Sequence, residues 1–332
     1  MEEECDNYFC VTMARFFSLR IIVTFLVFQA IGLSPSIVQA AQAPLIAVIY
    51  PELEEPYREV FSSIIEGIQE QIKGATRLYP LLKDYDSSKL NESIDSQHVA
   101  AIIALGRTGF AAAERWRGKV PIIVGALLLT PDKSEGGVAG ISLAADPVKL
   151  LAHLKRLVPA VKRVHVVYSA ANSTWLVQIA QDSCKKFNLQ LRAHKSEDIK
   201  NSALIYRDIL TKSKPGEDAI WLLPDPVAVD NRITLPLLLR GAWNNNVLLI
   251  SSNPYQVKRG ALFALFPDNR LMGVSLAKMA ESYRNDDAAN MSNKVVPLED
   301  LQAAINVRTA EHIGLVLSSE ERKDYALVFP VH

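Results

Sequence analysis

The chain has 332 residues, is 49% hydrophobic, and carries 36 basic and 36 acidic side chains. This neutral balance gives no electrostatic basis for binding nucleic acid or an anionic membrane, so we expect neither as a partner. The length is sufficient for two domains of ordinary size, and the apolar content for a buried core in each.

The first predicted element is an export signal. Two arginines precede an almost wholly apolar run at 21–33, and residues 38–40 place small side chains where signal peptidase cuts. We predict cleavage after Ala40, which makes 1–40 a signal peptide and the mature protein periplasmic. An uncleaved anchor is the alternative, but the run is shorter than the roughly 20 residues that span a bilayer. Residues 1–12 are acidic, and we interpret them as a mis-assigned extension before a true start at Met13.

Cysteine usage excludes an intrachain disulfide in the predicted mature protein. Cys5 and Cys10 lie before the expected cleavage point, so only Cys184 remains. Its place in a helical pattern predicts a buried, inert thiol rather than a nucleophile.

Short apolar runs then alternate with amphipathic stretches along the chain. The runs predict strands at 45–50, 99–105, 120–124, 164–168, 189–191, 219–223 and 247–250. The stretches predict helices at 55–72, 108–117, 147–157, 174–187, 202–212 and 231–245. Continuous apolar strands between helices predict an α/β fold with parallel sheets covered on both faces. Two such series predict two Rossmann-like lobes, with a ligand at the carboxyl ends of the strands.

The sequence offers little support for catalysis. It contains no Gly-x-Ser-x-Gly, His-Glu-x-x-His or Gly-x-x-x-x-Gly-Lys motif, and its histidines have no metal-ligand spacing. We therefore expect no enzyme activity, no cofactor and no metal. Gly106 and Thr108 lie where a strand meets a helix, which favours a carboxylate site at the helix N-terminus or a plain turn. A third glycine is missing, so a dinucleotide site is disfavoured.

Three strand-to-helix junctions in the second half of the chain are polar. The candidate ligand-binding residues at these junctions are Ser169, Asn172, Ser173, Asp225, Ser252 and Asn253. Hydroxyls and amides beside one carboxylate can hold a zwitterion or a polyol, but they do not form a nucleophile–base pair. Helix capping is the alternative role for Asp225.

Several segments resemble one protein family, the substrate-binding proteins of ABC transporters, in the branch with tryptophan- and tyrosine-type binding components. The similar segments are Gly-Ile-Ser at 140–142, Asp-Pro-Val-Lys-Leu-Leu at 146–151, Leu-Val-Pro-Ala-Val-Lys-Arg-Val at 157–164, Tyr-Ser-Ala-Ala-Asn-Ser at 168–173, 218–225, Val-Lys-Arg-Gly-Ala-Leu at 257–262, 268–280 and 305–315. The resemblance is good over about 138–317, and covers the first half only by pattern.

The resemblance implies a bilobal periplasmic-binding-protein-like fold of type I, with three hinge crossovers. It implies a first lobe of 44–142 plus 256–286 and a second of 143–255 plus 287–332. It also implies capture of a small polar ligand, for example an amino acid, by lobe closure. Its partners would then be that ligand and an ABC permease in the inner membrane, and the protein would be a monomer.

The chain departs from the family pattern at 127–133, where the usual loop is replaced by Leu-Leu-Leu-Thr-Pro-Asp-Lys, and at Ala170 and Ala171. These departures motivate a second hypothesis, a diverged sensor or accessory domain for a membrane signalling or uptake system. An exported α/β enzyme is a third hypothesis, which the missing catalytic motifs disfavour.

Overall fold

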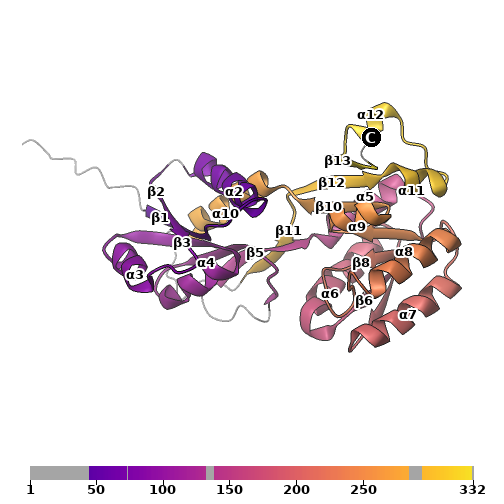
Figure 1. Cartoon of the computed structure of the whole chain (residues 1–332), viewed down its shortest axis with the longest axis horizontal. Helices are drawn as coiled ribbons and strands as arrows, with labels where there is room; N and C mark the ends of the chain where they lie inside the picture. Colours follow the sequence, from indigo (N-terminus) through magenta and orange to yellow (C-terminus); the bar gives the residue numbers. More distant parts are fainter. Residues whose placement is uncertain (1–44, 73, 132–137, 284–293, 331–332) are drawn as a thin grey trace, which may run out of the picture. The chain divides into compact units, whose positions relative to one another are not determined.

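The computed structural model describes residues 45–72, 74–131, 138–283 and 294–330. The predicted signal peptide and its extension lie outside these residues. The elements form two mostly parallel sheets, and most of their strands are labelled in Figure 1. No described helix is both long and apolar enough to cross a membrane.

The first sheet has the strand order β11-β5-β4-β3-β1-β2, and its neighbouring strands pair in parallel. Its strands are β1 (Leu45–Pro51), β2 (Thr76–Leu81), β3 (Val99–Leu105), β4 (Ile122–Leu127), β5 (Val138–Ala145) and β11 (Val295–Leu298). Its helices are α2 (Tyr57–Gln71), α3 (Ser87–Asp95), α4 (Gly106–Ala113) with the short η1 (Glu114–Trp116), and α10 (Asn269–Tyr283).

The second sheet has the order β13-β12-β10-β9-β8-β6-β7 and is parallel except where β12 runs against β10. Its strands are β6 (Arg163–Tyr168), β7 (Gln190–Lys195), β8 (Asp218–Leu222), β9 (Leu248–Ser251), β10 (Phe263–Pro267), β12 (Leu301–Asn306) and β13 (Leu327–Phe329). The helices that alternate with these strands along the chain are α5 (Pro147–Leu157), α6 (Ala170–Lys186), α7 (Ile199–Lys212), α8 (Thr234–Asn245), α9 (Pro254–Arg259), α11 (Val307–His312) and α12 (Ser319–Arg322).

The local sequence explains where these helices begin. The side chain of Asp146 accepts a hydrogen bond from the backbone N–H of Val148 at 2.8 Å, and Pro147 occupies the first helical turn of α5. Proline suits that position because its fixed φ is helical and it has no N–H to leave unpaired. The helix start predicted at residue 147 is therefore confirmed.

The chain passes between the two sheets three times. It leaves the first sheet after Ala145, returns to it through Asp268 into α10, and leaves again between β11 and β12. Together with the two parallel sheets, this topology confirms the predicted α/β fold class with three crossovers.

Strand pairing differs from the expected lobe boundaries at two places. The boundaries put 256–286 in the first lobe, whereas β10 pairs with β9 and β12 of the second sheet. They put everything after 286 in the second lobe, whereas β11 pairs with β5 of the first sheet. The reason is that the crossovers follow the ends of β10 and β11, which are short strands with weak sequence patterns.

Each sheet is buried on both faces by its helices. On the first sheet, Val48 and Ile103 pack with α2 and α10, whereas Ile49 and Ile102 belong to the core on the opposite face. The helices α2 and α10 lie side by side in Figure 1 although they are far apart in the chain. The two helices approach each other closely at Gly67, where a Cβ atom would lie only 2.0 Å from the carbonyl oxygen of Arg270.

Candidate functional site

The candidate site lies at the carboxyl ends of β6 and β8 in the second sheet. Ser169 directly follows β6, and Asp225 follows β8. The two strands are parallel neighbours, so their carboxyl ends meet at one edge of the sheet. Four of the sequence-predicted residues, Ser169, Asn172, Ser173 and Asp225, therefore come together there.

The carboxylate of Asp225 is the centre of this group and is only 1% exposed. Its Oδ2 accepts hydrogen bonds from the Ser169 backbone N–H at 2.8 Å and from the Ser173 hydroxyl at 2.9 Å. Its Oδ1 accepts one from the Val227 backbone N–H at 3.0 Å. The Ser169 hydroxyl lies 2.8 Å from Oδ2 and 3.1 Å from Oδ1, and donates a further hydrogen bond.

These donors, all from the same chain, occupy the hydrogen-bond acceptor positions of the carboxylate. A carboxylate has about four good acceptor positions, and here two hydroxyls and two backbone N–H groups occupy them. The bond to Val227 is local and resembles the capping role considered from the sequence, whereas the bonds to Ser169 and Ser173 join two different strand-to-helix junctions. Asp225 thus fixes the shape of the site by holding the start of α6 against the β8 loop.

Asn172 lies at the exposed rim of this group. Its Nδ2 donates to the Ser169 hydroxyl at 2.9 Å, and the side chain is only partly buried. Beside it, Ala170 and Ala171 are exposed in the first turn of α6. The N–H groups at these positions have no carbonyl partner within the helix, and they point toward the helix's positive end. This end of α6 is suited to an anionic group such as a carboxylate.

Ser252 and Asn253 belong to a separate pocket of about 350 Å³. The Asn253 side chain accepts a hydrogen bond from the Tyr255 N–H at 2.9 Å and so caps α9, while its own N–H donates to the Ser251 hydroxyl. The pocket lining includes Leu222, Pro224, Ser251, Ser252, Asn253, Gln256 and Phe266, and none of the four residues grouped at Asp225.

Gly106 and Thr108 lie on the other sheet, at the start of α4 after β3. Gly106 has φ +68°, and a Cβ there would lie 3.3 Å from the Phe61 ring, so the turn requires glycine. Thr108 is exposed. No hydrogen bond in the described structure joins either residue to the group at Asp225. The altered segment at 127–133 is described only as far as residue 131.

Sequence reasoning missed Gln256, which is buried and accepts a hydrogen bond from the Ser251 hydroxyl. The two side chains anchor the turn that presents Ser252. The sequence signal was weak, because an isolated glutamine in a short helix has no distinctive spacing. Among the described residues, no group of three or more His, Cys, Asp or Glu side chains could hold a metal ion.

Residues 62–325 match the family model of the ABC transporter substrate binding proteins. The match covers well over half of the chain, so the protein belongs to this family. Its α/β architecture with two mostly parallel sheets and three crossovers agrees with that assignment. The resemblance seen in the sequence is therefore confirmed. No curated protein matches the chain.

Solved structures share the fold. The chain is 17% identical to the ABC domain in complex with L-Trp from Streptococcus pneumonia, covering 86% of this chain and 99% of that one, with a TM-score of 0.51. It is 16% identical, with the same coverage and a TM-score of 0.57, to CD0873, a substrate binding protein with adhesive properties from Clostridium difficile in its ligand-free, open form. The chain is also 13% identical to a chain in a structure of a XylFII–LytSN complex, covering 78% of this chain and 96% of that one, with a TM-score of 0.50.

Proposed function

We propose that the protein is the solute-binding component of an ABC importer and acts outside the cytoplasm. It captures a small polar ligand, with an amino acid as the first candidate. The observation that supports this proposal is the group of polar side chains organised by Asp225 at the carboxyl ends of β6 and β8, in a chain of this family.

The geometry favours a ligand that carries a carboxylate. The free N–H groups at the start of α6 and the amide of Asn172 are donors, and the ligand's anionic group would lie against them. Asp225 has no acceptor position left for a ligand ammonium, so its part in binding is to hold Ser169 and Ser173 in place. The L-Trp carried by one structural relative supports the choice of amino acids for the first trial.

Two measurements test this function. Native mass spectrometry of the purified full chain should reveal a co-purified small mass, which would identify the ligand class. Isothermal titration with individual L-amino acids should then give saturable binding. Asn172→Ala should weaken that binding about 10-fold, since it removes a donor at the rim of the site.

A matched control is available on α8. Asn245 is exposed and donates to the carbonyl of Gly241 within its own helix, so Asn245→Ala should leave binding unchanged. An apo mass together with no heat change for any amino acid would argue against the proposed ligand class. Equal losses of affinity in the two variants would show that Asn172 does not contribute to the binding site.

A sensor or accessory domain is the second candidate function. It is favoured by the match to the XylFII–LytSN complex, in which a chain of this fold is bound to another protein. Co-purification from membranes distinguishes the two functions. A permease and ATPase recovered with the protein support transport, and a signalling receptor recovered instead supports sensing. Sedimentation of the purified protein tests the proposed monomeric state.

A further inference from the structure

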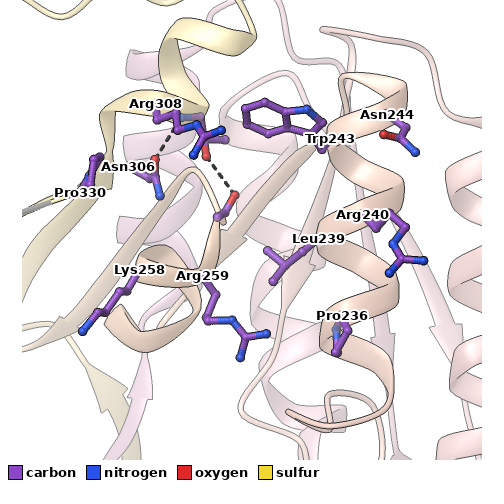
Figure 2. Close-up of a pocket in the computed structure, with 12 residues that line it drawn as sticks. Pro236, Leu239, Arg240, Trp243, Asn244, Lys258, Arg259, Asn306, Arg308 and Pro330 are labelled. Carbon is purple, nitrogen blue, oxygen red and sulfur yellow. Dashed lines mark hydrogen bonds between the residues drawn. The ribbon is translucent and has the colours of Figure 1, made fainter.

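A second pocket lies between α8 and α9, beside the start of α11, and has a volume of about 500 Å³. Its lining includes Leu239, Arg240 and Trp243 of α8, Lys258 and Arg259 of α9, and Arg308 of α11, which are labelled in Figure 2. This volume is within the range of small-molecule sites.

The pocket is at the opposite edge of the sheet from the group at Asp225. Gly260 precedes β10, and Asn306 ends β12, which runs antiparallel to β10. Both residues therefore lie near the amino ends of the parallel strands, whereas Asp225 follows the carboxyl end of β8. The pocket is separate from the ligand site proposed above.

Among the described residues, four cations and no carboxylate line this pocket. Arg240, Lys258, Arg259 and Arg308 are all exposed, and no ion pair to any of them is found in the described structure. Figure 2 shows Arg259 extending from α9 toward α8 and Arg308 beside the Trp243 ring, whereas Lys258 and Arg240 extend outward on either side. Uncompensated cations in one concave site raise the local concentration of anions.

Two uncharged polar side chains of the pocket, those of Asn306 and Thr309, already have partners. The Asn306 side chain donates to the carbonyl of Val257 at 2.8 Å and accepts from the Thr309 N–H at 3.0 Å. The Thr309 hydroxyl donates to the carbonyl of Gly260 at 3.1 Å. The Arg259 guanidinium donates to the Tyr255 hydroxyl at 2.9 Å, so its remaining N–H groups and the other three cations are the charged donors available to a ligand.

Trp243 positions one of these cations. Its ring stacks on His312, with 3.6 Å between the ring centroids and 8° between the planes. The guanidinium of Arg308 lies 5.6 Å from the centroid of the same indole ring. Such a cation–π contact restricts the arginine and lowers the entropy lost when it binds an anion.

We propose that this pocket binds a multiply charged phosphate-type oxyanion, with Arg259 and Arg308 as its principal donors. The planar guanidinium matches two oxygens of a phosphate group, and Lys258 and Arg240 add charge at the edges. The phosphate group can come from a soluble phosphate ester or from a lipid headgroup.

Titration of the full chain with inorganic pyrophosphate, at fixed ionic strength, tests the proposal. We expect saturable binding that Arg308→Gln and Arg259→Gln each weaken about 10-fold or more. Arg207→Gln is the matched control, because Arg207 is an exposed arginine of α7 outside the pocket. It should leave the affinity unchanged.

A second arm separates the two sources of phosphate. Binding to phosphatidylglycerol vesicles that is lost in Arg308→Gln and competed by pyrophosphate would support a lipid headgroup. Pyrophosphate binding without vesicle binding would support a soluble ester. The proposal would be overturned if neither probe bound, or if Arg207→Gln weakened binding as much as the pocket variants. Binding of a polyglutamate peptide alone would overturn it in favour of an acidic protein segment.

Discussion

The backbone N–H of Asp268 donates a hydrogen bond to the carbonyl oxygen of Asp300, at 2.9 Å. The two residues lie on different crossovers between the sheets, so the bond joins segments that must change together if the crossovers bend. The Asp300 carboxylate also accepts a hydrogen bond from Ser275 of α10 at 2.6 Å. The second and third crossovers are therefore linked to each other and to the helix that follows the second.

Asp268→Ala should lower the free energy of unfolding by about 1–2 kcal/mol. The Asp268 side chain accepts from the Leu271 N–H at 3.0 Å at the start of α10, and from the Gln302 amide at 3.0 Å. Gln302→Ala is the control, since it removes only the second bond and should cost less. Urea denaturation followed by circular dichroism measures both values, and equal losses would show that the α10 cap adds no stability.

Asp225→Asn should destabilise the fold by about 3 kcal/mol. The amide nitrogen would face donors, since Ser169, Ser173 and Val227 all donate to the present carboxylate. Ser173→Ala removes a single donor and should cost only about 1 kcal/mol. Thermal unfolding ranks the two variants, and a loss for Asp225→Asn no larger than that for Ser173→Ala would contradict the central role of the carboxylate.

Gly273→Ala should push α10 away from α2 and cost about 3 kcal/mol. A Cβ at Gly273 would lie 2.0 Å from the backbone carbonyl oxygen of Ile64, which cannot move without shifting the helix. Gln69→Ala is the matched control, because Gln69 is exposed on α2. Urea unfolding should show a large loss for the first variant and little change for the second. A neutral Gly273→Ala would mean that the helices are less tightly packed than the structure shows.

The free energy of unfolding should fall as the pH decreases from about 7 to 4, in part through His153. Burial, followed by the positive charge of Arg156, lowers the pKa of His153 from its ordinary 6.5 to about 4. Between these values the unfolded chain binds a proton that the folded chain does not, so acid favours unfolding. The Arg156 guanidinium donates to Nδ1 at 3.3 Å, which agrees with a neutral ring.

Denaturation at pH 7 and pH 5 isolates this contribution. His153→Gln removes the titrating group, so its stability should change less with pH than that of the unsubstituted protein. The full effect of such a pKa shift is on the order of 3 kcal/mol, reached near pH 4. Parallel pH dependence in the two proteins would show that His153 does not contribute to it.

Strong local patterns predicted the strands β1, β3, β4, β6, β7, β8 and β9. Five buried apolar runs, at 45–50, 99–105, 164–168, 219–223 and 247–250, are strands in the structure to within a residue or two. The strands β2, β5, β10, β11, β12 and β13 were not predicted from these patterns. Of these, β2 and β11 each contain a proline and lie at a sheet edge. An edge strand tolerates proline, so its sequence is less distinctive than that of a central strand.

The sequence predicted which residues would come together at the candidate site, but not the hydrogen bonds between them. The strand ends identified Ser169 and Asp225, since parallel neighbours meet at one edge of a sheet. The sequence could not show that donors from the same chain occupy the acceptor positions of the Asp225 carboxylate. The Ser173 hydroxyl can donate to this carboxylate only because α6 begins at Ala170. The pocket of Arg259 and Arg308 was not predicted either, since β12 brings these residues together from distant segments.

The pairing of α10 with α2 has a consequence for the order of folding. Ile64 and Ile68 of α2 share a buried core with Met272 and Leu276 of α10, which are synthesised some 200 residues later. In the second sheet, β13 completes the edge only at Leu327–Phe329. The first sheet can therefore complete its core only after Leu298 has been synthesised, and the second sheet only after β13 has been synthesised.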